Sequence, residues 1–156
     1  IVWGQPSWSN HYPSDHYPFM YKTRSKYNSI IKIRLADILL LKAEAYVETG
    51  NLQAAAALVN TVRNRAKLAD LPATTVSSKE KMADAVLNER RLELAFEGQR
   101  WFDLVRTGKV FSILNSLNTR DSGRLPMTPV TEETVLLPVP QTQIDKNPNL
   151  TQNKGY

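Results

Sequence analysis

The residues of this sequence best suited to chemistry lie between positions 89 and 108, where acidic, cationic and aromatic side chains alternate. Glu89, Glu93 and Glu97 stand four residues apart, so a helix would present all three carboxylates on one face. Two glutamates at this spacing bring their Cβ atoms within roughly 6 Å of each other. For Glu93 and Glu97, that separation is compatible with the acid and the base of a glycoside hydrolase.

The arginines of the same stretch favour a structural role instead. Arg100 and Arg106 follow Gly98, and Asp103 lies three residues from each arginine. We expect both guanidinium groups to reach back across a bend at Gly98 and to hold the glutamates ionised, which is the wrong state for a general acid. The sequence therefore predicts no catalytic residue, but a structural ion-pair cluster that sets the angle between two helices. Its predicted members are Glu89, Glu93, Glu97, Arg100, Asp103 and Arg106.

Two helices upstream form a predicted antiparallel hairpin. Residues 33–48 are apolar on nearly every side, Gly50 ends that helix, and Asn51 can cap a second helix over residues 52–66. Small and apolar residues recur along the pair at spacings similar to those of a tetratricopeptide repeat. Since repeats of this kind need about three stacked units for stability, part of the first helix should face loops or polypeptide absent from this sequence.

Two carboxylates, Asp37 and Glu44, interrupt the first of these helices. Burying an unpaired carboxylate is costly, so each needs a cationic partner. We expect Arg34, Arg63 or the stretch at 89–106 to supply these partners.

A third helix is predicted to begin at a capping box of Ser77 and Glu80 and to run to residue 97. A short helix follows, and residues 110–117 add another turn or two. Residues 134–140 contain two prolines and favour an extended edge or an isolated hairpin. The predicted fold is all-α, with tetratricopeptide-like helical hairpins, long irregular loops and at most a short β-hairpin.

We expect one domain over residues 1–156. Its regions would be an aromatic and proline-rich loop region at 1–32, a helical core at 33–118, and a loop with an extended tail at 119–156. Aromatic rings beside polar side chains suit a sugar, whose C–H faces stack on rings. The alternative is that the rings only fix the loop to the helical body. The candidates for carbohydrate contact are Trp3, Trp8 and Tyr12.

The overall composition argues against several other functions. The formal net charge of +5 is modest and the basic residues are scattered, so we expect no nucleic-acid partner. With no cysteine and only His11 and His16, we expect neither a metal site nor a cofactor. No apolar run reaches the length of a membrane span. A start at Ile1 without a signal peptide leads us to expect a processed or excised piece.

The stretch at 89–108 resembles the C-terminal signature of the SusD/RagB family, the nutrient-binding lipoproteins of the Bacteroidetes outer membrane. Family members carry the pattern ERR-x-ELAFEG-x-RW-x-DL-x-R-x-G, which is far more specific than a three-residue motif. All of its fixed positions are present, namely Glu89, Arg90, Arg91, Glu93, Leu94, Ala95, Phe96, Glu97, Gly98, Arg100, Trp101, Asp103, Leu104, Arg106 and Gly108.

Two further blocks resemble the same family and occur in the family's order. Residues 33–66 match the block that precedes the signature, with Leu35 where the family usually has Tyr. Residues 138–156 resemble the family ending, with Val139 in place of Ile and Lys154 in place of Pro. Three ordered blocks make chance an untenable explanation, so the chain resembles the C-terminal portion of a SusD-like protein.

The resemblance implies a cell-surface subunit that binds oligosaccharide without chemistry on it. Such a subunit works beside a SusC-like TonB-dependent transporter, on the extracellular face of the outer membrane. It is held there by a lipid anchor, which would lie outside this sequence. Ligand contacts in the family come largely from loops, so we expect the helical part to act first as a scaffold.

Two other classes of function stay open from the residues. A tetratricopeptide-like interaction module would bind peptide and have no affinity for glycans. A glycoside hydrolase would cleave its glycan, and changing Glu93 and Glu97 to Gln would abolish that activity while leaving the fold intact.

Overall fold

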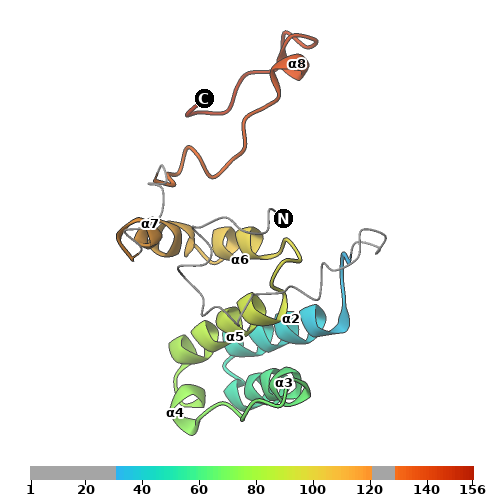
Figure 1. Cartoon of the computed structure of the whole chain (residues 1–156), viewed down its shortest axis with the longest axis vertical. Coiled ribbons are helices and arrows are strands. Elements are labelled where there is room, and N and C mark those ends of the chain that lie inside the picture. The colour runs from blue at the N-terminus through green and yellow to red at the C-terminus, as the bar shows by residue number, and fades with distance from the viewer. Residues whose placement is uncertain (1–30, 121–128) are drawn as a thin grey trace, which may run out of the picture. The chain divides into compact units, whose positions relative to one another are not determined.

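A computed structural model of the chain describes residues 31–120 and 129–156, apart from the side chains of residues 118–120. The chain divides into two compact units, residues 1–32 and residues 33–156. All the helices described below belong to the second unit (Figure 1).

Helices α2 (Leu35–Glu48) and α3 (Leu52–Arg65) form the predicted hairpin. Gly50 in the connection has a φ of +80°, a left-handed conformation that glycine adopts without strain. The side chain of Asn51 accepts a hydrogen bond from the backbone N–H of Ala54 at 3.3 Å and so caps α3. The local signals that predicted this hairpin are therefore the ones that build it.

Helix α5 (Lys79–Glu93) packs against both helices of the hairpin, and the single turn α4 (Ala73–Val76) precedes it. The predicted capping box at Ser77 is wrong by one residue. Ser77 ends α4, because its backbone N–H bonds to the carbonyl of Ala73. Ser78 caps α5 instead, by accepting from the N–H of Lys81 at 3.3 Å.

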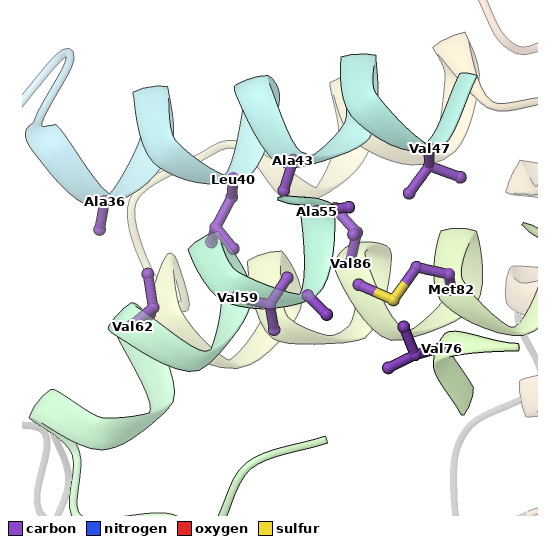
Figure 2. Close-up of a cluster of buried hydrophobic side chains, with 11 residues drawn as sticks. Ala36, Leu40, Ala43, Val47, Ala55, Val59, Val62, Val76, Met82 and Val86 are labelled. Atoms are coloured by element: carbon purple, nitrogen blue, oxygen red, sulfur yellow. The ribbon is translucent and has the colours of Figure 1, made fainter. Parts of the chain in front are cut away.

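The hydrophobic core lies among α2, α3 and α5, with one contribution from α4 (Figure 2). Its buried members are Ala36, Leu40, Ala43, Val47, Ala55, Ala56, Val59, Val62, Val76, Met82 and Val86. Other apolar residues of α2 do not enter this core: Leu35 is 72% exposed, and Ile38 and Leu41 are also exposed. Part of the apolar surface of α2 is therefore left uncovered by the described residues.

Helix α5 ends at Glu93, four residues before the predicted end, because the backbone turns over residues 94–98. Phe96 and Gly98 have φ angles of +67° and +79°, and a left-handed residue cannot continue a right-handed helix. Two more helices follow in this order: α6 (Arg100–Arg106) and α7 (Val110–Arg120).

The C-terminal tail contains one helical turn, α8 (Gln141–Ile144), and no strand occurs within residues 31–120 and 129–156. The extended backbone at Val139 is paired by a side chain instead. Gln152 accepts from the N–H of Val139 at 2.7 Å and donates to its carbonyl at 3.0 Å. Asn115 holds Val130 in the same way, at 2.8 and 3.0 Å. One amide thus supplies the two hydrogen bonds that a neighbouring strand would give.

The all-α prediction is confirmed, and the described part of the chain is helical with irregular connections. None of its helices is both long and apolar enough to span a membrane.

Candidate functional site

Arg34, the residue before α2, binds both Glu93 and Glu97, the two glutamates whose spacing is compatible with catalysis. Its Nη1 lies 2.6 Å from Oε1 of Glu93, and its Nε lies 2.8 Å from Oε2 of Glu97. Nη2 donates to Glu97 Oε1 at 2.9 Å and to the backbone carbonyl of Glu93 at 2.6 Å. The hydrogen bond to Glu97 is the main reason that the pKa of Arg34 is raised above its ordinary value. A single guanidinium therefore joins the end of α5 to the start of α2.

Two arginines near the end of α3 bind the same acidic face of α5. Arg65 donates to both carboxylate oxygens of Glu93 at 2.6 Å. Arg63 donates to Oε2 of Glu89 at 3.0 Å, and its Nε also donates to the carbonyl of Ala69 at 2.8 Å. These contacts place cations opposite the repeated glutamates, and so offset the repulsion expected at four-residue spacing.

Arg90 is the buried centre of a second set of ion pairs. Its Nη1 lies 2.7 Å from Oδ1 of Asp37, and its Nε donates to both carboxylate oxygens of Asp103 at 3.0 and 2.9 Å. Arg106 donates to Asp103 Oδ1 at 2.8 Å and also pairs with Glu44. The hydrogen bond to Glu44 is the main reason that the pKa of Arg106 is raised. Three carboxylates and two guanidiniums thus alternate in the order Asp37, Arg90, Asp103, Arg106 and Glu44.

These contacts change the predicted pairing within the cluster. The glutamates at 93 and 97 are bound by Arg34 and Arg65, whereas Arg106 binds Asp103 and Glu44. Arg100, also predicted to reach a carboxylate, donates to the backbone carbonyl of Leu87 at 3.3 Å. Arg106 reaches Glu44 of α2 instead of the glutamates of α5, so the reach assumed from the sequence is wrong.

The expectation for Asp37 and Glu44 is met by Arg90 and Arg106, both within the 89–106 stretch. Arg90 itself was not among the predicted cluster members. Arg90 lies three residues after Leu87 and four before Leu94, so a helix places it on the same face as these two apolar residues. This spacing could have indicated a buried arginine, which requires carboxylate partners.

The geometry at Glu93 and Glu97 does not suit acid–base catalysis. Both carboxylates accept hydrogen bonds from one guanidinium, and both side chains are about 90% shielded, with 9% and 10% exposed. A general acid or base must come within hydrogen-bond distance of its substrate, whereas the oxygens of these shielded carboxylates are occupied by guanidinium donors. Among the described residues, no group of three or more acidic or histidine side chains could hold a metal ion.

A pocket of about 250 Å³ lies beside the bend between α5 and α6. Its lining includes Arg91, Leu94, Phe96, Gly98, Arg100 and Trp101. Burial, followed by the neighbouring charge of Arg91, lowers the pKa of Arg100. The sequence did not predict this pocket, because it depends on how the turn over residues 94–98 places the two helices.

The predicted carbohydrate-contact residues Trp3, Trp8 and Tyr12 lie outside the described residues.

The profile of the SusD family matches residues 8–156, nearly the whole chain. The chain belongs to the SusD family. SusD-like protein P38 of Formosa agariphila is 36% identical over 134 residues, which are 82% of this chain and 25% of the relative. The starch-binding protein SusD of Bacteroides thetaiotaomicron is 32% identical over 149 residues, 96% of this chain and 25% of the relative.

Solved structures show the same relationship. A SusD superfamily protein from Bacteroides vulgatus matches 80% of this SusD-family chain with a TM-score of 0.66 and 29% identity. Surface glycan-binding protein A from Bacteroides thetaiotaomicron matches 78% with a TM-score of 0.60 and 29% identity. The chain covers 27% and 23% of these two structures. It therefore spans about a quarter of the length of its relatives.

Proposed function

We propose that this SusD-family chain acts in glycan binding at the cell surface and leaves the glycan chemically unchanged. The observation that carries the proposal is that the guanidinium of Arg34 forms ion pairs with both Glu93 and Glu97. It leaves the two candidate catalytic carboxylates as parts of the scaffold. The names of two relatives, a starch-binding protein and a surface glycan-binding protein, support binding as the function of the family.

We further propose that the protein captures oligosaccharide for import together with a SusC-like TonB-dependent transporter. It would work on the extracellular face of the outer membrane, attached through a lipid anchor outside residues 1–156. Membership of the SusD family supports this assignment. Within it, the ion-paired helices α2, α3 and α5 act as a rigid support, and loops supply the ligand contacts.

Trp3, Trp8 and Tyr12 are the proposed ligand contacts, on the sequence argument that sugar rings stack on aromatic side chains beside polar groups. Calorimetric titration with a panel of oligosaccharides, maltooligosaccharides included, tests this. We expect saturable binding whose affinity falls about tenfold in Trp8→Ala, because stacking of a sugar on one aromatic ring contributes a free energy equivalent to such a factor. Phe102→Ala removes an exposed ring of α6 that is not among the proposed contacts, and should not weaken binding.

An assay for newly released reducing ends on the same samples separates binding from cleavage. We expect intact oligosaccharide after prolonged incubation. Cleavage that disappears in Glu97→Gln would instead establish a hydrolase. Binding of peptides without binding of any glycan would establish the interaction module.

A further inference from the structure

The pocket beside the bend brings together two guanidinium groups whose hydrogen bonds end on neutral acceptors. Arg91 donates through Nε and Nη2 to Oδ1 of Asn88, at 3.2 and 2.9 Å. Arg100 donates through Nη1 to the carbonyl of Leu87 at 3.3 Å. Neither arginine forms an ion pair within the described parts of the chain, whereas Arg34, Arg63, Arg65, Arg90 and Arg106 all do.

The charges around the pocket favour an anion. Arg90, Arg91 and Arg100 line it, and no carboxylate is among its lining residues. Arg90 is already paired with Asp37 and Asp103, which leaves Arg91 and Arg100 for a ligand. Each guanidinium has further N–H donors beyond those already used, and their planar forks match a carboxylate. Burial and then the charge of Arg91 lower the pKa of Arg100, while the charge of Asp103 acts in the opposite direction. An entering negative charge would offset the repulsion between the two guanidinium groups.

Aromatic side chains complete the lining. Trp101 and Phe96 come from the two sides of Gly98, and both line the pocket. Phe96 is 68% exposed although its backbone has a φ of +67°. A bulky residue in that conformation is strained, and such strain is found most often at functional positions. The strain is not offset by burial of the ring.

We propose that this pocket binds one carboxylate-bearing sugar unit, a hexuronate, of an acidic oligosaccharide. Arg91 and Arg100 would bind the carboxylate, and Trp101 and Phe96 would contact the C–H faces of the ring. The pocket volume of about 250 Å³ lies just below the range of sites for drug-sized ligands, which favours a ligand as small as one sugar ring. A compact pocket favours a sugar unit over a peptide, which is recognised along an extended strand or groove.

This inference names the substrate class of the proposed glycan-binding function and rests on it. The test uses the whole 156-residue chain and NMR titration of the Trp indole signals, with the signal of Trp101 assigned from Trp101→Phe. The probes are methyl glucuronide, methyl galacturonide, their neutral parents methyl glucoside and methyl galactoside, and a blocked Glu-Phe dipeptide. We expect at least one uronide to shift the Trp101 signal and to bind roughly tenfold or more tightly than its neutral parent. Added salt should weaken that binding.

Two variants test the assigned residues. Arg91→Gln should weaken uronide binding about tenfold, because it removes a charged donor. Lys81→Gln removes the same charge from an exposed position on the same helix and should leave the affinity unchanged. Phe96→Gly should weaken binding while the melting temperature stays equal or rises, because glycine adopts a positive φ without strain. A ring with only a structural role would instead lower the melting temperature when removed.

The inference is wrong if the uronides bind no better than their neutral parents, or if Arg91→Gln binds them as well as the unchanged chain does. Binding of the dipeptide in preference to both uronides would assign the pocket to a polypeptide. The results distinguish a wrong assignment of the pocket from a wrong assignment of the glycan-binding function. Neutral oligosaccharides that bind normally in Arg91→Gln would leave only the pocket assignment wrong. Uronides that bind at Trp101, with no oligosaccharide binding anywhere, would overturn the broader function.

Discussion

The guanidinium of Arg90 and the carboxylate of Asp103 form a buried ion pair, with Nε 2.9 Å from Oδ2 and each side chain only 3% exposed. Asp37 binds the same guanidinium from α2. Burying charged groups is tolerable only when every charge is paired and hydrogen-bonded. Among the described residues, no buried side-chain nitrogen or oxygen lacks a hydrogen-bond partner. The two ion pairs of Arg90 therefore join α2, α5 and α6 at one buried guanidinium.

Replacing Arg90 by Met should destabilise the protein by about 3–5 kcal/mol, because the buried carboxylate of Asp37 would lose its cationic partner and that of Asp103 would keep only Arg106. Urea unfolding followed by circular dichroism measures this loss. Lys79→Met is the matched control, since Lys79 pairs with Glu48 at the surface. The control should cost less than about 1 kcal/mol. Equal losses in the two variants would show that the Arg90 contacts contribute no more than a surface pair.

Glu97→Gln should lower stability by roughly 1–3 kcal/mol, the usual range for losing a charged hydrogen bond. The loss should be smaller than in Arg90→Met, because the side chain of Arg34 is 23% exposed and keeps its ion pair with Glu93. Thermal melts measure the loss, and Glu48→Gln, in the exposed pair with Lys79, is the control. A variant that melts like the unchanged chain would contradict the structural role of Glu97.

Substitutions at Gly98 and Phe96, which both have a positive φ, should change the free energy of unfolding in opposite directions. Gly98→Ala places a Cβ in open space, so its cost of about 1–2 kcal/mol is backbone strain alone. Phe96→Gly removes strain of the same origin and loses a ring that is mostly exposed, so it should be neutral or stabilising. Urea unfolding of both variants measures the two effects. Stabilisation by Gly98→Ala would show that the turn is not left-handed at that residue.

Gln152→Ala should free the backbone of Val139 without unfolding the helices, since the side chain makes both hydrogen bonds to that residue. We expect exchange of the Val139 amide proton to quicken about tenfold, which corresponds to losing about 1.4 kcal/mol of local stability. Hydrogen exchange measured by NMR reports this amide directly. Gln143→Ala, also in the tail and exposed, should leave that rate unchanged.

Local rules were enough to predict much of the fold. The α2–α3 hairpin, its turn at Gly50 and its cap at Asn51 follow from apolar spacing and from capping preferences that act within a few residues. The errors arose where two local signals competed. Ser77 and Ser78 are both suitable caps, and the preceding turn α4 decided between them. The early end of α5 escaped prediction because Phe96 is not a residue type that usually adopts a positive φ.

By itself, the sequence determined the family, the all-α class, and a stretch at 89–108 whose charges had to be paired. Only the tertiary structure decided which charges pair. Arg34 and Glu97 are 63 positions apart in the chain, and Arg90 and Asp37 are 53 apart. Such partners meet only after α2, α3 and α5 have packed. Helix periodicity indicates which face of a helix a residue occupies, whereas an ion pair also depends on the distance and angle between helices, which packing sets.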